Sequence, residues 1–80
     1  YPNPFSPELN INVNIEQNSQ VNILVYNLNG QLVKNIYKGM LYANQTNHFK
    51  WNASNVSSGI YIIKINANNF TQSKIVNLLK

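Results

Sequence analysis

The stretch that decides the fold runs from Gly59 to Ala67 and reads "GIYIIKINA". β-Branched and aromatic residues dominate it, and these residue types favour β-strands. Alternate residues of a strand point to opposite faces, so Tyr61, Ile63 and Ile65 share one face while Lys64 points the other way. Gly59 lets the chain turn sharply into this run. The stretch therefore predicts a central strand that gives one whole face to the core.

The same alternation of apolar and polar residues recurs through the rest of the chain, and it predicts strands. In the run around Trp51 it places Phe49 and Trp51 inward and His48 and Lys50 outward. The further strand-like runs, in chain order, are "NINVNIE" (10–16), "QVNILVYN" (20–27), "QLVKNIYK" (31–38), "TNHFKWN" (46–52) and "FTQSKIVNLLK" (70–80).

The segments between these runs indicate how the strands pair. Asn29-Gly30 separates two apolar runs, which predicts a two-residue type I′ hairpin because both residue types tolerate positive φ. The run from 31 to 38 has an ambiguous phase, which a β-bulge would explain. The stretch "GMLYANQ" (39–45) reads as a loop or a short edge piece.

Six or seven short strands joined by tight turns predict an all-β protein, a small antiparallel β-sandwich of immunoglobulin type. A fully closed barrel is the alternative architecture. No segment shows the period of an amphipathic helix, and no apolar run approaches the roughly 18 residues of a membrane span. We expect a single domain over residues 1–80, with the Pro-rich stretch 1–8 as a lead-in from a longer protein. Within that lead-in, Phe5 is expected to cover the open end of the sandwich.

Composition limits the chemistry of the chain. There is no Cys, which removes disulfides, thiolate catalysis and cysteine-based zinc sites. Six basic residues against two acidic ones give a net charge of +4. All six are Lys and they are dispersed along the chain. Nucleic-acid binding proteins concentrate Lys and Arg on one face, so the sequence does not favour a nucleic-acid partner.

The titratable residues do not form a catalytic set. Glu8 and Glu16 are the only carboxylates, and they lie at opposite ends of a predicted strand. His48, the only His, alternates with inward residues and is expected to point to solvent. A nucleophile with its base, or a metal site, needs several convergent groups. The sequence therefore predicts no enzyme, no cofactor and no metal.

The aromatic residues allow a second interpretation. Tyr26, Tyr37, Tyr42, Trp51 and Tyr61 on an Asn-rich sandwich could form a platform on which sugars stack. The alternative, which we favour for Trp51, is that the rings fill the core and the cross-strand gaps.

Several motifs in a fixed order resemble a known family. They are "YPNPF" at the start, "VYNLNGQLV" in the middle, a Trp before a polar loop, "SSGIYIIKI", and "KIVNLLK" at the end. Together they resemble the C-terminal sorting domain of the bacterial type IX secretion system, type A, also called the Por secretion tail. The pattern is shared in part by the Ig-like domain of flagellar hook-capping proteins. Those relatives usually carry a "WDG"-like loop where this chain has "WNASNVSSG", a departure that favours the sorting family.

The resemblance implies that the chain is a sorting signal, which directs a cargo protein to its destination and catalyses no reaction. Such domains sit at the C-terminus of cargo proteins in Bacteroidota and are recognised in the periplasm. They direct the cargo through the outer-membrane translocon, with a shuttle protein and a sortase-like peptidase as further partners, to the cell surface or the medium. The sorting and recognition positions expected here are Pro2, Asn3, Pro4, Gly30, Gly59, Tyr61, Lys64, Lys74, Ile75, Val76, Leu78, Leu79 and Lys80.

The last strand is the element we expect the machinery to read. An exposed terminal strand can accept a partner strand at its edge, with backbone hydrogen bonds giving affinity and Lys giving register. The same edge allows self-association. The rival function is that of a passive Ig-like spacer or a carbohydrate-binding module of a bacterial surface protein.

Overall fold

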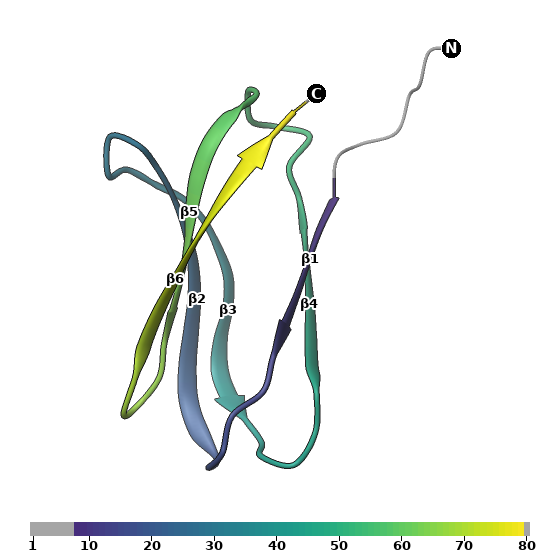
Figure 1. Ribbon diagram of the computed structural model, residues 1–80, viewed down its shortest axis with the longest axis vertical. Helices are drawn as coiled ribbons and strands as arrows, with labels where there is room; N and C mark the ends of the chain where they lie inside the picture. Colours follow the sequence, from purple (N-terminus) through teal and green to yellow (C-terminus); the bar gives the residue numbers. More distant parts are fainter. Residues whose placement is uncertain (1–7, 80) are drawn as a thin grey trace.

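The run that begins at Gly59 forms an inner strand of a four-stranded antiparallel sheet with the order β3-β2-β5-β6 (Figure 1). The structure is a computed structural model and describes residues 8–79. A second, two-stranded antiparallel sheet, β1-β4, covers one face of the first. The six strands are β1 (Glu8–Val13), β2 (Ser19–Asn27), β3 (Leu32–Leu41), β4 (Asn47–Asn52), β5 (Gly59–Asn66) and β6 (Thr71–Leu78).

This arrangement confirms the prediction of a small antiparallel β-sandwich. The alternative of a closed barrel is wrong for the described residues, because no backbone pairing joins the two sheets. Figure 1 shows that the start of β1 and the end of β6 lie at the same end of the molecule. Within residues 8–79 no helix has the length and hydropathy needed to cross a bilayer. The position expected for Phe5 lies outside the described residues.

The core lies between the sheets and follows from the alternation in the sequence. Tyr61, Ile63 and Ile65 are buried on one face of β5, as predicted, and Trp51 of β4 is only 3% exposed. His48 and Lys50 are exposed on the other face of β4. The remaining buried apolar residues are Val13, Ile15, Val21, Ile23, Val25, Leu41 and Ala53. At about 25 cal/mol per Å² of apolar surface removed from water, this shared layer is the main stabilising contribution.

Strand β3 differs from its prediction in two respects. The strand continues through Gly39, Met40 and Leu41 at the edge of the sheet, so of the two alternatives for these residues the loop is wrong. Its pairing with β2 also shifts register twice, which confirms the expected bulge and adds a second irregularity. The shifts bring Val33, Ile36 and Tyr37 into contact with the core although their spacing does not fit one period of two.

Asparagine side chains form hydrogen bonds between the loops at the lower end of the sandwich in Figure 1. Asn18 accepts a hydrogen bond of 2.8 Å from the backbone of Ala43 through its Oδ1. Asn47 donates through Nδ2 to the carbonyl of Val13 at 3.1 Å. These bonds bridge segments far apart in the sequence. Asn18 and Asn47 therefore have a structural role, since short polar side chains satisfy turn backbone groups that strands leave unpaired.

Candidate functional site

Gly30 lies in the β2–β3 turn, and the turn is not the predicted type I′. Gly30 has a positive φ of 83°, but the only non-glycine residue with positive φ among residues 8–79 is Asn44. Asn29 therefore does not adopt the conformation that type I′ requires. The Gly30 N–H donates to the carbonyl of Asn27 at 3.0 Å, and the Asn27 N–H donates to the carbonyl of Gln31 at 3.0 Å. This is a three-residue loop in which a type I turn is followed by a left-handed glycine.

Asn27 explains why this longer turn is preferred. Its Oδ1 accepts hydrogen bonds from the N–H groups of Asn29 at 2.9 Å and Gln31 at 3.0 Å. Asn at the first turn position and Gly at the fourth is the pattern of a type I turn. The signal was present in the sequence as Asn27 and Gly30.

Gly59 and Tyr61 build the corner at which the chain enters β5. Gly59 has a φ of 155°, a backbone conformation that side-chain-bearing residues rarely adopt, so glycine is required there. The buried Tyr61 donates its hydroxyl hydrogen bond to the carbonyl of Ser57 at 2.7 Å. Its ring packs edge-on against Trp51, with centroids 5.6 Å apart and an interplanar angle of 75°. Tyr61 thus fixes the β4–β5 loop to the core, and its side chain is buried.

Replacing Tyr61 with Phe is expected to lower the free energy of unfolding by about 1 kcal/mol, because it removes the hydrogen bond to Ser57 and keeps the ring. Urea unfolding followed by far-ultraviolet circular dichroism measures the change. Tyr42→Phe is the matched control, because Tyr42 is 52% exposed and surface substitutions cost less than about 0.5 kcal/mol. Equal midpoints for the Tyr61→Phe variant and the wild type would contradict the role given to the hydroxyl.

The expected recognition residues of the last strand divide between its two faces. Lys74 pairs with Ile63, and Val76 pairs with Tyr61, so both belong to the inward face of β6. Val76 and Leu78 pack against the core. Ile75 pairs with Ile62 on the outward face and is 71% exposed, and Leu79, which follows the strand, is 77% exposed.

Among the other expected positions, Lys64 lies on the outer face of β5, half-buried, between Leu24 of β2 and Ser73 of β6. Pro2, Asn3, Pro4 and Lys80 lie outside the described residues.

The open side of the sandwich lies between β1 and β6. Within the described chain β1 pairs only with β4, and β6 pairs only with β5, so each strand has one unpaired edge. The sequence did not single out the β1 contribution to this side, because Leu9 and Ile11 read simply as one face of a strand. A groove of about 290 Å³ runs here, and its apolar and charged lining includes Leu9, Ile11, Ile63, Ile65, Lys74 and Val76.

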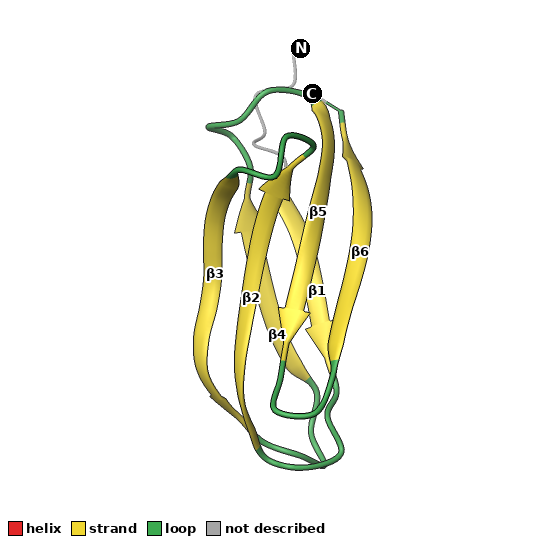
Figure 2. Cartoon of the chain, turned by 90° about the vertical axis from the view of Figure 1, so that its left-hand side faces the viewer, coloured by secondary structure: helices red, strands yellow, loops and turns green. Residues whose placement is uncertain are grey.

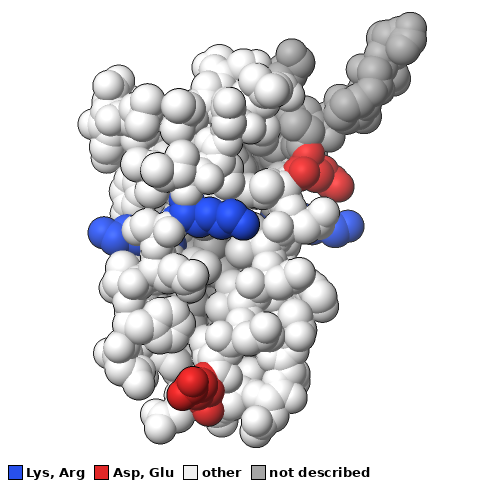
Figure 3. All heavy atoms as spheres, in the orientation of Figure 1, with Lys and Arg blue, Asp and Glu red and all other residues white. Residues whose placement is uncertain are grey.

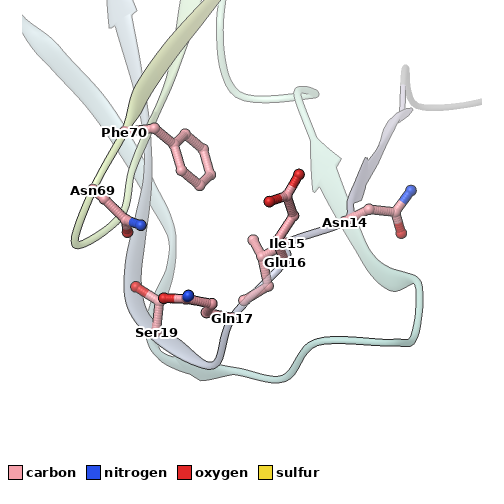
Figure 4. Close-up of a pocket in the computed structure, with 7 residues that line it drawn as sticks. All are labelled: Asn14, Ile15, Glu16, Gln17, Ser19, Asn69 and Phe70. Carbon is pink, nitrogen blue, oxygen red and sulfur yellow. The ribbon is translucent and has the colours of Figure 1, made fainter.

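A second hollow, of about 330 Å³, lies at the lower end of the sandwich (Figure 4). Its lining includes the Glu16 carboxylate, the Phe70 ring and the Asn69 amide, which face a common space in Figure 4. No second titratable side chain lines it. His48 instead places its Nδ1 2.6 Å from Asn12 Oδ1 on the exposed face of the smaller sheet. The described residues therefore do not bring an acid and a base together at this hollow.

Charged side chains are sparse and separate on the surface. In Figure 3 the visible basic groups lie near mid-height, and the two acidic groups lie above and below them. The five rings do not form one sugar platform, because Trp51 and Tyr61 are buried in the core and stacking requires an exposed face. What the surface offers is a free strand edge, a groove and exposed apolar residues, which suit protein recognition.

Comparison with known proteins assigns the chain to a family. The family model described as "secretion system C-terminal sorting domain" matches residues 1–77. No match was found among curated proteins or among solved structures. The matched family is the C-terminal sorting signal of type IX secretion, which leads to export to the cell surface or the medium and is in general not catalytic. The chain belongs to the secretion system C-terminal sorting domains, and its function is that of a type IX secretion signal.

Proposed function

We propose that the free edge of β6 is the element that the type IX secretion machinery reads, by pairing a strand of its own with it. The observation that carries this proposal is the position of β6 at the end of the four-stranded sheet, with β5 on one side only. Alternate backbone N–H and C=O groups of an edge strand point away from the sheet and remain available. A partner strand would gain its affinity from these groups.

The two edges of the larger sheet differ in a way that favours β6. β3, at the opposite edge, shifts register twice against β2. Bulges of this kind twist an edge away and discourage pairing. β6 pairs with β5 in an unbroken register from Thr71 to Leu78. A regular edge of eight residues therefore stands at one side of the sheet and an irregular edge at the other.

Lys74 supplies selectivity at the β6 edge. It lies on the inward face of β6 and lines the groove between β6 and β1. An inward-pointing charge on an edge strand disfavours pairing with any strand that does not neutralise it. A partner strand that places a carboxylate opposite Lys74 is accepted in one register, and strands without one are rejected.

The rest of the route follows from the family resemblance. We place residues 1–80 in one non-catalytic sorting domain, with the stretch 1–8 leading in from a cargo. In this proposal the cargo reaches the periplasm of a Bacteroidota cell by its own signal. The shuttle protein, the outer-membrane translocon and a sortase-like peptidase then act on the folded domain in turn.

A reporter protein fused upstream of these 80 residues tests the route. We expect the reporter in the medium or on the surface of wild-type cells, and in the periplasm of cells that lack the type IX translocon. The same reporter without the 80 residues is the control and is expected to stay in the periplasm of both strains. Export of the fusion in both strains, or in neither, would contradict the proposed function.

A further inference from the structure

The outer face of the four-stranded sheet, which faces the viewer in Figure 2, carries an apolar row that crosses all its strands. The strand register places Tyr26 opposite Leu32 on one side and Ile62 on the other, and Ile62 opposite Ile75. We call Leu32, Tyr26, Ile62 and Ile75 the outer apolar row. With neighbouring strands about 4.8 Å apart, the row is about 14 Å long.

The two ends of the row are well exposed, and Tyr26 and Ile62 in its middle are half-buried. Leu32 is 57% exposed and Ile75 is 71% exposed. Ile60, which neighbours Ile62 on the same face of β5, is 42% exposed. A sheet with one face on the core usually presents polar residues to water on the other. Contiguous exposed apolar residues mark interaction sites.

The rest of this face is mostly polar and carries two lysines, with Leu24 and Met40 as its apolar residues. Two residues along β2 and β5 from the outer apolar row, the register aligns Asn35, Leu24, Lys64 and Ser73. The next row consists of Lys38, Asn22, Asn66 and Thr71. The face is thus divided along the strands into an apolar end and an end that carries Lys38 and Lys64.

The four-stranded sheet has no carboxylate to balance these lysines. The chain contains only two acidic residues. Glu8 begins β1 in the other sheet, and Glu16 lies between β1 and β2. A second copy that docks through the same face would therefore bring no opposite charge to it. The charge complement of the face is a surface that is apolar at one end and carries carboxylates at the other.

We propose that the outer face of the four-stranded sheet is a docking surface for a protein of the secretion machinery whose contact surface is apolar and flanked by carboxylates. The proposal rests on the proposed function. Ile75 belongs to the outer apolar row and also to β6, so the docking surface adjoins the β6 edge. A partner that adds a strand to β6 extends the sheet and continues over this face. The edge then supplies affinity, and the face supplies specificity through apolar contact and charge.

The test is export of the reporter fusion with Ile62→Ser and Ile75→Ser introduced together. We expect export to fall about tenfold or more, because a few central contacts carry most of the energy of a protein interface. Asn22→Ser with Asn66→Ser, on the polar end of the same face, is the matched control and is expected to export normally. Thermal unfolding of each purified 80-residue chain checks folding. If the double variant unfolds, Ile75→Ser alone replaces it, since Ile75 is largely exposed and contributes little to the core.

Charge reversal tests the carboxylates of the partner. Lys38→Glu with Lys64→Glu is expected to reduce export, whereas Lys38→Arg with Lys64→Arg keeps it. Normal export of a folded Ile62→Ser, Ile75→Ser variant would overturn the proposal, as would normal export after charge reversal. If the wild-type fusion itself is not exported, the proposed function fails instead.

Two further measurements address other occupants of the face. Sedimentation equilibrium of the chain reports a second copy, and flotation with phosphatidylglycerol vesicles reports a membrane surface. Dimerisation or vesicle binding that the two serine substitutions abolish would assign the face to that occupant and overturn the proposal. A monomer that does not float supports it.

Discussion

Replacing Trp51 with Ala is expected to bring the domain close to unfolding. Trp51 is 3% exposed and packs edge-on against Tyr61 between the two sheets. Deleting a buried Trp side chain costs about 3–5 kcal/mol, from lost burial and the cavity left behind. A chain of this length has a free energy of unfolding of about 4–12 kcal/mol at the usual stability per residue. Urea unfolding followed by far-ultraviolet circular dichroism measures the loss without depending on Trp fluorescence.

The controls separate the buried ring from the exposed ones. Trp51→Phe keeps an aromatic partner for Tyr61, so its loss of stability is expected to be smaller than that of Trp51→Ala. Tyr42→Ala removes a ring that is 52% exposed and is expected to cost less than about 0.5 kcal/mol. A Trp51→Ala variant with a midpoint equal to that of Tyr42→Ala would show that the ring is not part of the core.

The strands could be predicted where alternation is regular. Tyr61, Ile63 and Ile65 lie at alternate positions of a run rich in β-branched residues, which predicted the strand and its buried face, although Ile60 and Ile62 on the opposite face are apolar too. Strand β3 was harder, because two register shifts bring Val33, Ile36 and Tyr37 to one side. No single period describes such a segment, and the Gly at 39 suggested a loop where the strand continues.

The sequence predicted the hairpin between β2 and β3 but not the type of its turn. Asn29-Gly30 correctly marked a hairpin turn, but the Asn27 side chain stabilises a loop one residue longer through two backbone hydrogen bonds. The burial of Ser19 was likewise not predicted. Ser19 is buried at the start of β2, and its Oγ accepts a hydrogen bond of 3.0 Å from the Asn68 N–H in the β5–β6 turn. Contacts that join residues so far apart depend on tertiary packing that a local pattern does not contain.

The sequence predicted which strand is available to a partner, but not which side chains lie together on the surface of the sheet. The sequence indicated that the last strand is available to a partner, and the motif order indicated the family. The surface depends on which strands are neighbours. Tyr26, Leu32 and Ile62 were unremarkable as single residues, and the strand register brings them into one row with Ile75. The groove between β1 and β6 likewise requires the sheet order.

Deleting residues 77–80 from the reporter fusion is expected to reduce export about tenfold or more, the equivalent of at least ~1.4 kcal/mol of lost binding. The deletion removes the two residues of β6 that pair with Gly59 and Ile60, together with the exposed Leu79. The end of β6 would then offer no backbone groups to which a partner strand could hydrogen-bond. We expect the truncated fusion in the periplasm, measured by immunoblotting of cell fractions.

Loss of folding is the competing explanation for the truncation, because Leu78 packs against the core. Leu78→Ala is therefore the matched control, since it removes the same packing and leaves the strand edge in place. If the edge is what the machinery reads, Leu78→Ala lowers the melting temperature of the domain while the reporter is still exported. Equal export defects in the two variants would assign the effect to stability, and normal export of the truncated fusion would exclude the end of β6 from recognition.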